Sequence, residues 1–168
     1  MAHTPVNHPL RPLYRAIAAI VGVYLIVFGV LGLILTADEG LFGRAGDRVL
    51  GQGTNLFWSI VTIVLGAVVV IATVLGRNLD VAVYTYVGWA LLVVGTFSMA
   101  VIRTDANFLD FSMSTVIVTY LAGLALILAG LYVKVAPPEQ AGAPRQVREG
   151  RVREGQVREG QVREGRPA

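Results

Sequence analysis

Four long apolar runs follow one another along this chain, separated by polar stretches. They cover about residues 16–35, 56–75, 81–102 and 111–133. A hydrocarbon core about 30 Å thick needs roughly 20 apolar residues in helical form, and each run meets that length. The pattern predicts an all-α fold, an integral membrane four-helix bundle in up-down-up-down order. The transmembrane domain is expected to cover residues 13–135.

The two ends of the chain have a different character. Three prolines within residues 1–12 are incompatible with a regular helix, so we expect a disordered lead in which Pro12 begins the first helical turn. Residues 136–168 contain four pentapeptides of the VREG type. A period of five matches neither a helix nor a strand, and each glycine costs a helix roughly 1 kcal/mol. We therefore expect a disordered tail, which either solubilises the chain or contacts anionic lipid or a partner.

The basic residues favour one orientation. With four spans both termini share a side, and that side holds eleven of the fourteen Lys and Arg residues. Counted only near the spans, the difference narrows to four against three. The positive-inside rule then places both termini in the cytoplasm of a multi-pass plasma-membrane protein. Aromatic residues are expected to form interfacial belts, near the cytoplasmic boundary at Tyr14, Tyr84, Tyr86 and Tyr132 and near the outer one at Phe57, Trp58, Phe108 and Phe111.

Glycine spacing is the most informative pattern inside the runs. Three runs carry glycines seven residues apart, close to two helical turns: Gly22 with Gly29, Gly88 with Gly95, and Gly123 with Gly130. Small residues on one face let membrane helices approach closely. We interpret the six as helix-packing residues, with a pore or ligand seam as the alternative.

Two pairs of segments are similar to each other. GVYLIVFG (22–29) resembles GWALLVVG (88–95), and VTIVLGAVVVIA (61–72) resembles VTYLAGLALILA (118–129). The offsets are 66 and 57 residues. Two helical hairpins in the same orientation, a parallel repeat, would explain them. Coincidence within a narrow alphabet explains them equally well.

None of the four runs contains a charged residue or a histidine, which disfavours a proton-coupled pump. A path lined by hydroxyls stays open, although such hydroxyls commonly bond to the carbonyl one turn back or bridge helices. The residues concerned are Ser59, Thr62, Thr96, Ser98, Ser114, Thr115 and Thr119.

The polar segments between the runs carry no recognisable catalytic or metal-binding motif. Gly76–Asp80 is expected to be a tight turn, with Asn78 or Asp80 capping the next helix. The 36–54 connector is glycine-rich and polar, and its acidic residues lack the spacing of a cation loop. The chain has no cysteine, and His3 and His8 lie in the lead. We expect no metal, no cofactor, no catalytic residues and no nucleic-acid partner.

From Asn7 to Lys134 the chain resembles a family of small four-span membrane proteins that is common in actinobacteria and has no assigned activity. The resemblance rests on NHPLRPLYR, GVYLIVFGVLGLIL, VLGQGTN before the second run, and the polar stretch with Asp110 before the fourth. Members often carry a histidine near the start of the second and fourth spans. This chain has Ser59, Thr62 or Ser114 in that neighbourhood instead.

These observations lead to two hypotheses about function. The first is a non-enzymatic structural or interaction protein of the cell envelope, which packs in the lipid bilayer against itself as a homo-oligomer or against another membrane protein. The second is a small transporter or channel subunit for a neutral or lipid-like solute. Neither hypothesis requires a cofactor.

Overall fold

A computed structural model describes residues 6–43, 46, 48–137 and 154. Four helices dominate it: α1 (Arg11–Leu35), α2 (Leu56–Leu75), α3 (Leu79–Val101) and α4 (Met113–Tyr132). The expected lead falls partly, and the expected tail almost wholly, outside the described residues.

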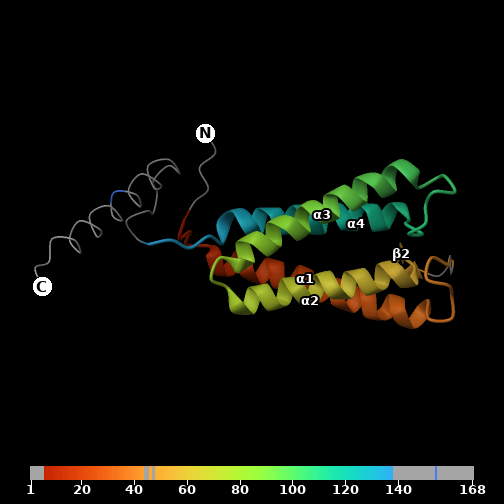
Figure 1. The fold of residues 1–168 in the computed structure, drawn as a ribbon, viewed down its shortest axis with the longest axis horizontal. Helices are drawn as coiled ribbons and strands as arrows, with labels where there is room; N and C mark the ends of the chain where they lie inside the picture. Colours follow the sequence, from red (N-terminus) through yellow and green to blue (C-terminus); the bar gives the residue numbers. More distant parts are fainter. Residues whose placement is uncertain (1–5, 44–45, 47, 138–153, 155–168) are drawn as a thin grey trace, which may run out of the picture.

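The helices run up-down-up-down, so the predicted bundle is confirmed (Figure 1). α1 packs along α2 and α3 along α4, which makes two antiparallel hairpins lying side by side. The described chain enters and leaves at one end, called here the terminus end. The opposite end carries the α1–α2 connector and the α3–α4 loop, and we call it the connector end.

Local signals explain where the helices begin and end. Pro12 lies in the first turn of α1, as predicted. The Asn55 side chain accepts the Trp58 N–H and caps α2, while Ser112 caps α4 through a capping box with Thr115. Each cap satisfies backbone donors that the first helical turn leaves without a partner.

The predicted turn between α2 and α3 is confirmed, and Asn78 occupies the N-cap position of α3, but it makes no side-chain capping bond. Gly76 ends α2 with φ of 63°, a conformation that glycine adopts at little cost. Asn78 precedes α3 in a left-handed conformation, and its side chain makes no cap bond. Asp80 lies inside the first turn of α3, where its Oδ1 accepts the neighbouring Val81 N–H.

α1 and α3 both begin earlier than the apolar runs. α1 starts at Arg11, five residues before the expected 16, and α3 starts at Leu79. Arg11, Arg15 and Asp80 therefore lie within spanning helices, which corrects the expectation of spans without charge. The apolar runs mark only where the side chains are apolar. The helices extend beyond the runs, because helix boundaries depend on backbone hydrogen bonds and not on side-chain polarity.

The connector contains a short β-hairpin that the sequence pattern did not indicate. β1 (Arg48–Val49) pairs antiparallel with β2 (Gln52–Gly53), so that Val49 faces Gln52. Leu50 and Gly51, at φ of 50° and 78°, form the two-residue turn between them. The pairing positions Gln52 just before α2, with its side chain buried.

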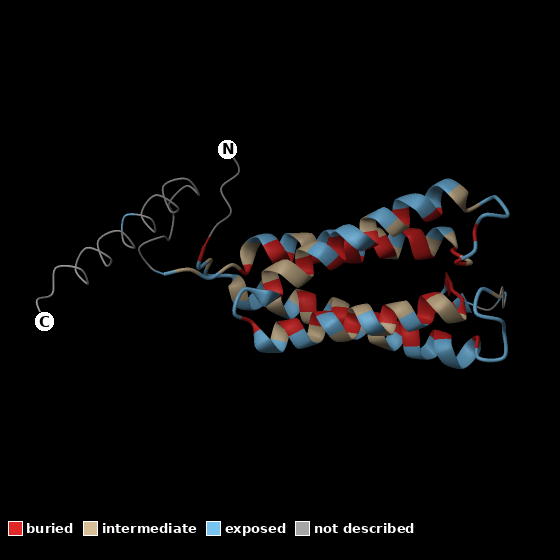
Figure 2. Ribbon diagram, viewed as in Figure 1, coloured by how far each residue is buried: buried red, intermediate tan, exposed pale blue. Residues whose placement is uncertain are grey.

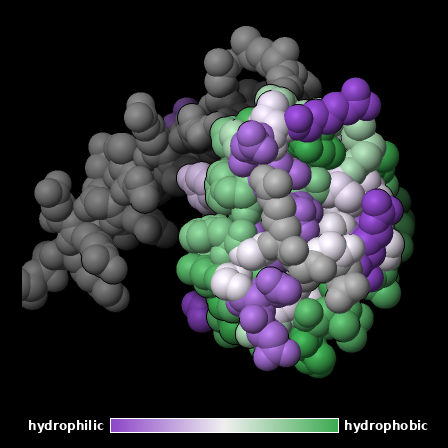
Figure 3. Space-filling model, turned by 90° about the vertical axis from the view of Figure 1, so that its right-hand side faces the viewer, coloured by the Kyte–Doolittle hydropathy of each residue, from purple (hydrophilic) through white to green (hydrophobic). Residues whose placement is uncertain are grey.

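Burial follows the face of each helix that meets its neighbours. The buried residues line the inside of the bundle, and the sides of all four helices expose aliphatic and aromatic residues (Figure 2). Seen from the connector end, polar residues gather on the end surface and apolar residues surround it (Figure 3). All four helices are long and apolar enough to cross a bilayer, so the chain is a multi-pass membrane protein.

Candidate functional site

Glycines bring the two helices of each hairpin into close contact. A Cβ built on Gly22 would lie 3.2 Å from the Gly66 carbonyl oxygen, and one built on Gly66 would lie 2.5 Å from the Gly22 carbonyl. Gly88 and Gly123 face each other in the second hairpin with corresponding distances of 2.8 and 2.9 Å. Any larger residue at Gly66 would meet backbone that cannot rotate away.

The other predicted glycines differ in how tightly they are enclosed. Gly29 lies against α2, where a Cβ would be 2.5 Å from the Ser59 carbonyl oxygen, and Gly130 lies against Thr85 of α3. Gly95 has ordinary room, with its nearest neighbour at 3.6 Å. Gly66 was missed as a packing residue because it has no glycine seven positions away, although it lies in the segment that resembles residues 118–129.

The two hairpins are built alike at positions related by the offsets of 66 and 57. The close pair Gly22–Gly66 corresponds to Gly88–Gly123, and the cap Asn55 corresponds to the cap Ser112. The correspondence includes buried core residues, namely Leu25 with Leu91, Val69 with Leu126, and Ala72 with Ala129.

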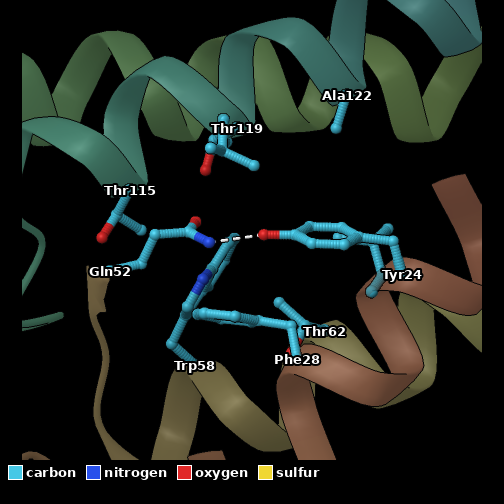
Figure 4. Close-up of a pocket in the computed structure, with 10 residues that line it drawn as sticks. Tyr24, Phe28, Gln52, Trp58, Thr62, Thr115, Thr119 and Ala122 are labelled. Carbon is cyan, nitrogen blue, oxygen red and sulfur yellow. Dashed lines mark hydrogen bonds between the residues drawn. The ribbon is translucent and has the colours of Figure 1, made fainter. Parts of the chain in front are cut away.

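A small cavity lies where the two hairpins meet, towards the connector end (Figure 4). It is lined by side chains of α1, α2, α4 and β2: Tyr24, Leu25, Phe28, Gln52, Trp58, Thr62, Thr115, Val118, Thr119 and Ala122. The space inside it for a water-sized group is about 10 Å³. That volume is at the lower limit for a single water molecule.

The polar groups of the cavity come from all four lining elements, and the Thr62 hydroxyl of α2 donates to the Ser59 carbonyl of its own helix. The Gln52 amide donates a hydrogen bond to the Tyr24 hydroxyl across the cavity. The Thr115 hydroxyl donates to the Gly53 carbonyl at 2.8 Å. The Thr119 hydroxyl points into the cavity and makes no hydrogen bond with the described part of the chain. None of the lining residues carries a charge.

Three further hydrogen bonds hold the β-hairpin over this cavity. The Gly53 N–H donates to the Ser112 hydroxyl at 2.9 Å, and the Ser114 hydroxyl donates to the Gly51 carbonyl at 2.7 Å. The Asn55 amide donates to the Phe108 carbonyl at 2.6 Å. The connector of the first hairpin is therefore attached to the start of α4, and Gln52 is fixed between the hairpins.

A buried carboxylate joins the hairpins at the terminus end. Asp80 is 0% exposed, and its Oδ2 lies 3.6 Å from an Arg11 nitrogen and 3.7 Å from Arg15 Nε. Arg11 Nε donates to the Val133 carbonyl at 2.9 Å, and Arg15 donates to the Thr73 carbonyl. The cluster links α1, α2, α3 and the chain after α4. Burial makes such a carboxylate costly unless its charge is compensated, and the two arginines supply the compensation.

The segments next to the helices pack at the terminus end as well. The Asn78 amide and Val135 backbone exchange two hydrogen bonds, and the Asn7 N–H donates to the Lys134 carbonyl at 3.0 Å. The His8 ring contacts the stacked pair Tyr14 and Tyr132. Within the expected lead, Asn7 and His8 therefore contact the terminus end of the bundle.

Three of the aromatic residues assigned to interfacial belts are instead buried. Tyr84 is 0% exposed, and its hydroxyl shares a hydrogen bond with Thr73 at 2.6 Å. Trp58 and Phe111 contact each other inside the bundle. Spacing from the end of a helix does not show the face on which a residue lies.

Three of the seven hydroxyls considered as a polar path bond close by along the chain. Ser59, Thr62 and Thr96 each donate to a carbonyl three or four residues earlier in their own helix. Ser98 is buried and has no hydrogen-bond partner among the described residues. Among the residues that the structure describes, no three His, Cys, Asp or Glu side chains lie close enough together to hold a metal ion.

The comparisons with known proteins agree with the resemblance seen in the sequence. A family model described as a domain of unknown function, DUF4383, matches residues 15–132, which covers all four helices in large part. No curated protein and no solved structure matches. The chain is a multi-pass membrane protein, and it belongs to the DUF4383 family.

Proposed function

We propose that this protein is a non-enzymatic component of the cell envelope that binds another membrane-spanning polypeptide through the outward face of α3. Four large residues form that face, at spacings of three, four and four: Tyr86, Trp89, Val93 and Phe97. These spacings place them on one side of a helix. All four are exposed in the monomer.

Trp89 is the observation that carries the proposal. It is the eleventh of the 23 residues of α3 and therefore lies roughly 16 Å along the helix, near the middle of the bilayer. It is 57% exposed, and its indole N–H has no partner in the described part of the chain. Tryptophan normally lies at the membrane interface, because hydrocarbon offers its N–H no acceptor.

The other helices expose a different kind of surface to lipid. The outward residues of α2, such as Val64, Val68 and Ile71, are aliphatic, as are Ile117, Leu121 and Leu128 of α4. Aliphatic faces suit acyl chains, whereas rigid aromatic side chains are typical of the centres of protein interfaces. This contrast supports a helix of another polypeptide, rather than lipid, as the neighbour of α3.

The glycines also support contact through α3 rather than through a glycine seam. Gly22, Gly66, Gly88 and Gly123 are already used within the hairpins, so their small-residue faces are not available to a partner. Without a hydrophobic driving force in lipid, association through α3 would rely on van der Waals packing and on an acceptor for the indole N–H.

A photo-crosslinking residue in place of Trp89, in the full chain and in native membranes, tests the proposal. We expect a defined protein adduct, at about twice the 18.0 kDa of the chain if the partner is a second copy. Val64 is the matched control, because it is 55% exposed near the middle of α2. Lipid adducts alone at both positions would refute the proposal.

A second candidate function is a subunit of a small transporter for a neutral or lipid-like solute. The uncharged cavity between the hairpins favours it, because transporter sites commonly lie where two similar halves meet. Flux of a neutral solute into liposomes containing the purified chain is the test. A flux equal to that of protein-free liposomes would exclude this candidate.

A further inference from the structure

We propose that the cavity between the hairpins binds the hydroxyl group of a neutral membrane amphiphile, such as a long-chain alcohol or an acylglycerol. This inference is independent of the contact proposed for α3, because that contact lies on the outward face of α3 and no residue of α3 lines the cavity. It rests on the size, the chemistry and the position of the cavity.

Its size selects the group that enters. About 10 Å³ accommodates one water-sized group, such as a hydroxyl, and is too small for a ring or a phosphate. Aromatic side chains of Tyr24, Phe28 and Trp58 surround this space and fix its shape (Figure 4).

The chemistry of its lining selects a neutral group that both donates and accepts. The Thr119 hydroxyl points into the cavity without a partner among the described residues, beside the hydrogen bond between Gln52 and Tyr24 (Figure 4). A ligand hydroxyl can pair with Thr119 and with either of the other two, because a hydroxyl has one donor and two acceptor positions. A charged head group would be desolvated without a counter-charge, since no lining residue is charged.

The position of the cavity selects an amphiphile over a water-soluble alcohol. Tyr24 and Val118 are only partly buried, on the α1 and α4 sides of the seam. Their sequence neighbours Val23 and Ile117 face lipid. An acyl chain can therefore remain in the bilayer while its hydroxyl enters between the two helices.

The depth of the cavity agrees with this arrangement. Thr119 is the seventh residue of α4, roughly 10 Å from the connector end of that helix. A head group at this depth lies below the membrane surface but well short of the midplane, which suits the weakly polar end of an uncharged lipid.

Fluorescence of Trp58 provides the test. The chain has two tryptophans, so the Trp89→Phe protein in liposomes reports on Trp58 alone. The probe is 2-bromohexadecan-1-ol, whose bromine quenches tryptophan on contact. The control is 1-bromohexadecane, which lacks the hydroxyl. We expect saturable quenching by the alcohol and only a linear dependence on mole fraction for the bromoalkane.

Two variants locate the binding group. Thr119→Val keeps the shape of the side chain and removes the hydroxyl, and we expect it to raise the half-saturating alcohol fraction about tenfold. Thr96→Val, which removes an exposed hydroxyl elsewhere, should leave saturation unchanged. Equal, linear quenching by both probes in the Trp89→Phe protein would overturn the proposal. That comparison leaves the cavity itself unaltered, so it is decisive even if Thr119→Val folds poorly.

Discussion

Replacing Gly66 with alanine tests the close backbone contact between α1 and α2. The added Cβ would lie 2.5 Å from the Gly22 carbonyl oxygen, 2.8 Å from Ile26 Cγ1 and 2.9 Å from the Ile26 backbone nitrogen. Two of these three atoms belong to the backbone of α1. The helices must therefore separate, since no side-chain rotation relieves the contact.

Two opposing terms set the size of the effect. Overpacking costs typically about 1–3 kcal/mol, and backbone contacts place this site near the upper figure. The higher helix propensity of alanine stabilises the folded state by at most about 1 kcal/mol relative to glycine. Together these values predict that Gly66→Ala lowers the free energy of unfolding by about 2 kcal/mol.

The matched controls lie at other glycines. At Gly95 the nearest atom to a built Cβ is 3.6 Å away, so Gly95→Ala should be neutral or stabilising. Gly123→Ala should fall between the two, because its closest contact is 2.9 Å and Leu92 can move. Reversible unfolding in mixed detergent micelles, followed by circular dichroism, measures the three free energies. Equal values for Gly66→Ala and Gly95→Ala would refute the close packing of α1 on α2.

Three further predictions concern the ends of the bundle. Asp80→Asn should lower the free energy of unfolding by about 1–3 kcal/mol. This is less than the roughly 3–5 kcal/mol of a fully buried ion pair, because the arginines are partly exposed. A double-mutant cycle with Arg15→Gln should show coupling, and additive effects would contradict the ion cluster. Asn55→Ala and Ser112→Ala should each lower the free energy of unfolding by about 1 kcal/mol or more, since each removes a helix cap and a hydrogen bond between the two connecting segments. Unfolding in detergent micelles measures this loss, and wild-type stability of either variant would contradict the capping role of that residue. Deleting residues 138–168 should leave insertion and unfolding unchanged because the described contacts of the chain after α4 end at Ala136; failure to insert, seen by membrane fractionation, would contradict this.

The charged cluster illustrates how sequence reasoning can miss a contact. Arg11, Arg15 and Asp80 lie just outside the apolar runs, so they were assigned to flanks and a turn. In the structure they lie within helices and meet across the two hairpins. The 64 residues between Arg15 and Asp80 carry no local signal of this meeting. An acidic residue flanked by apolar positions at a helix start was the available hint.

The cavity was out of reach of the sequence for the same reason. Gln52 belongs to the glycine-rich, polar connector of residues 36–54, whose sequence does not indicate a hairpin. Its burial depends on a two-residue turn and on bonds from Ser112, Ser114 and Thr115 of a distant segment. Thr62 and Thr119, by contrast, are recognisable from the sequence as hydroxyls within the spans, although nothing in the sequence places them together.

Sequence alone determined the number of helices, their order and the solvent around them. Those properties depend on run length and on caps such as Asn55 and Ser112, which act within a few residues along the chain. Only the tertiary structure decided which faces meet, and hence that Asp80, Gln52 and Tyr84 are buried while Trp89 faces outward. In lipid both sides of a helix are apolar, so hydrophobicity cannot distinguish the packed face from the exposed one. That choice is made by close packing and hydrogen bonding between segments far apart in the chain.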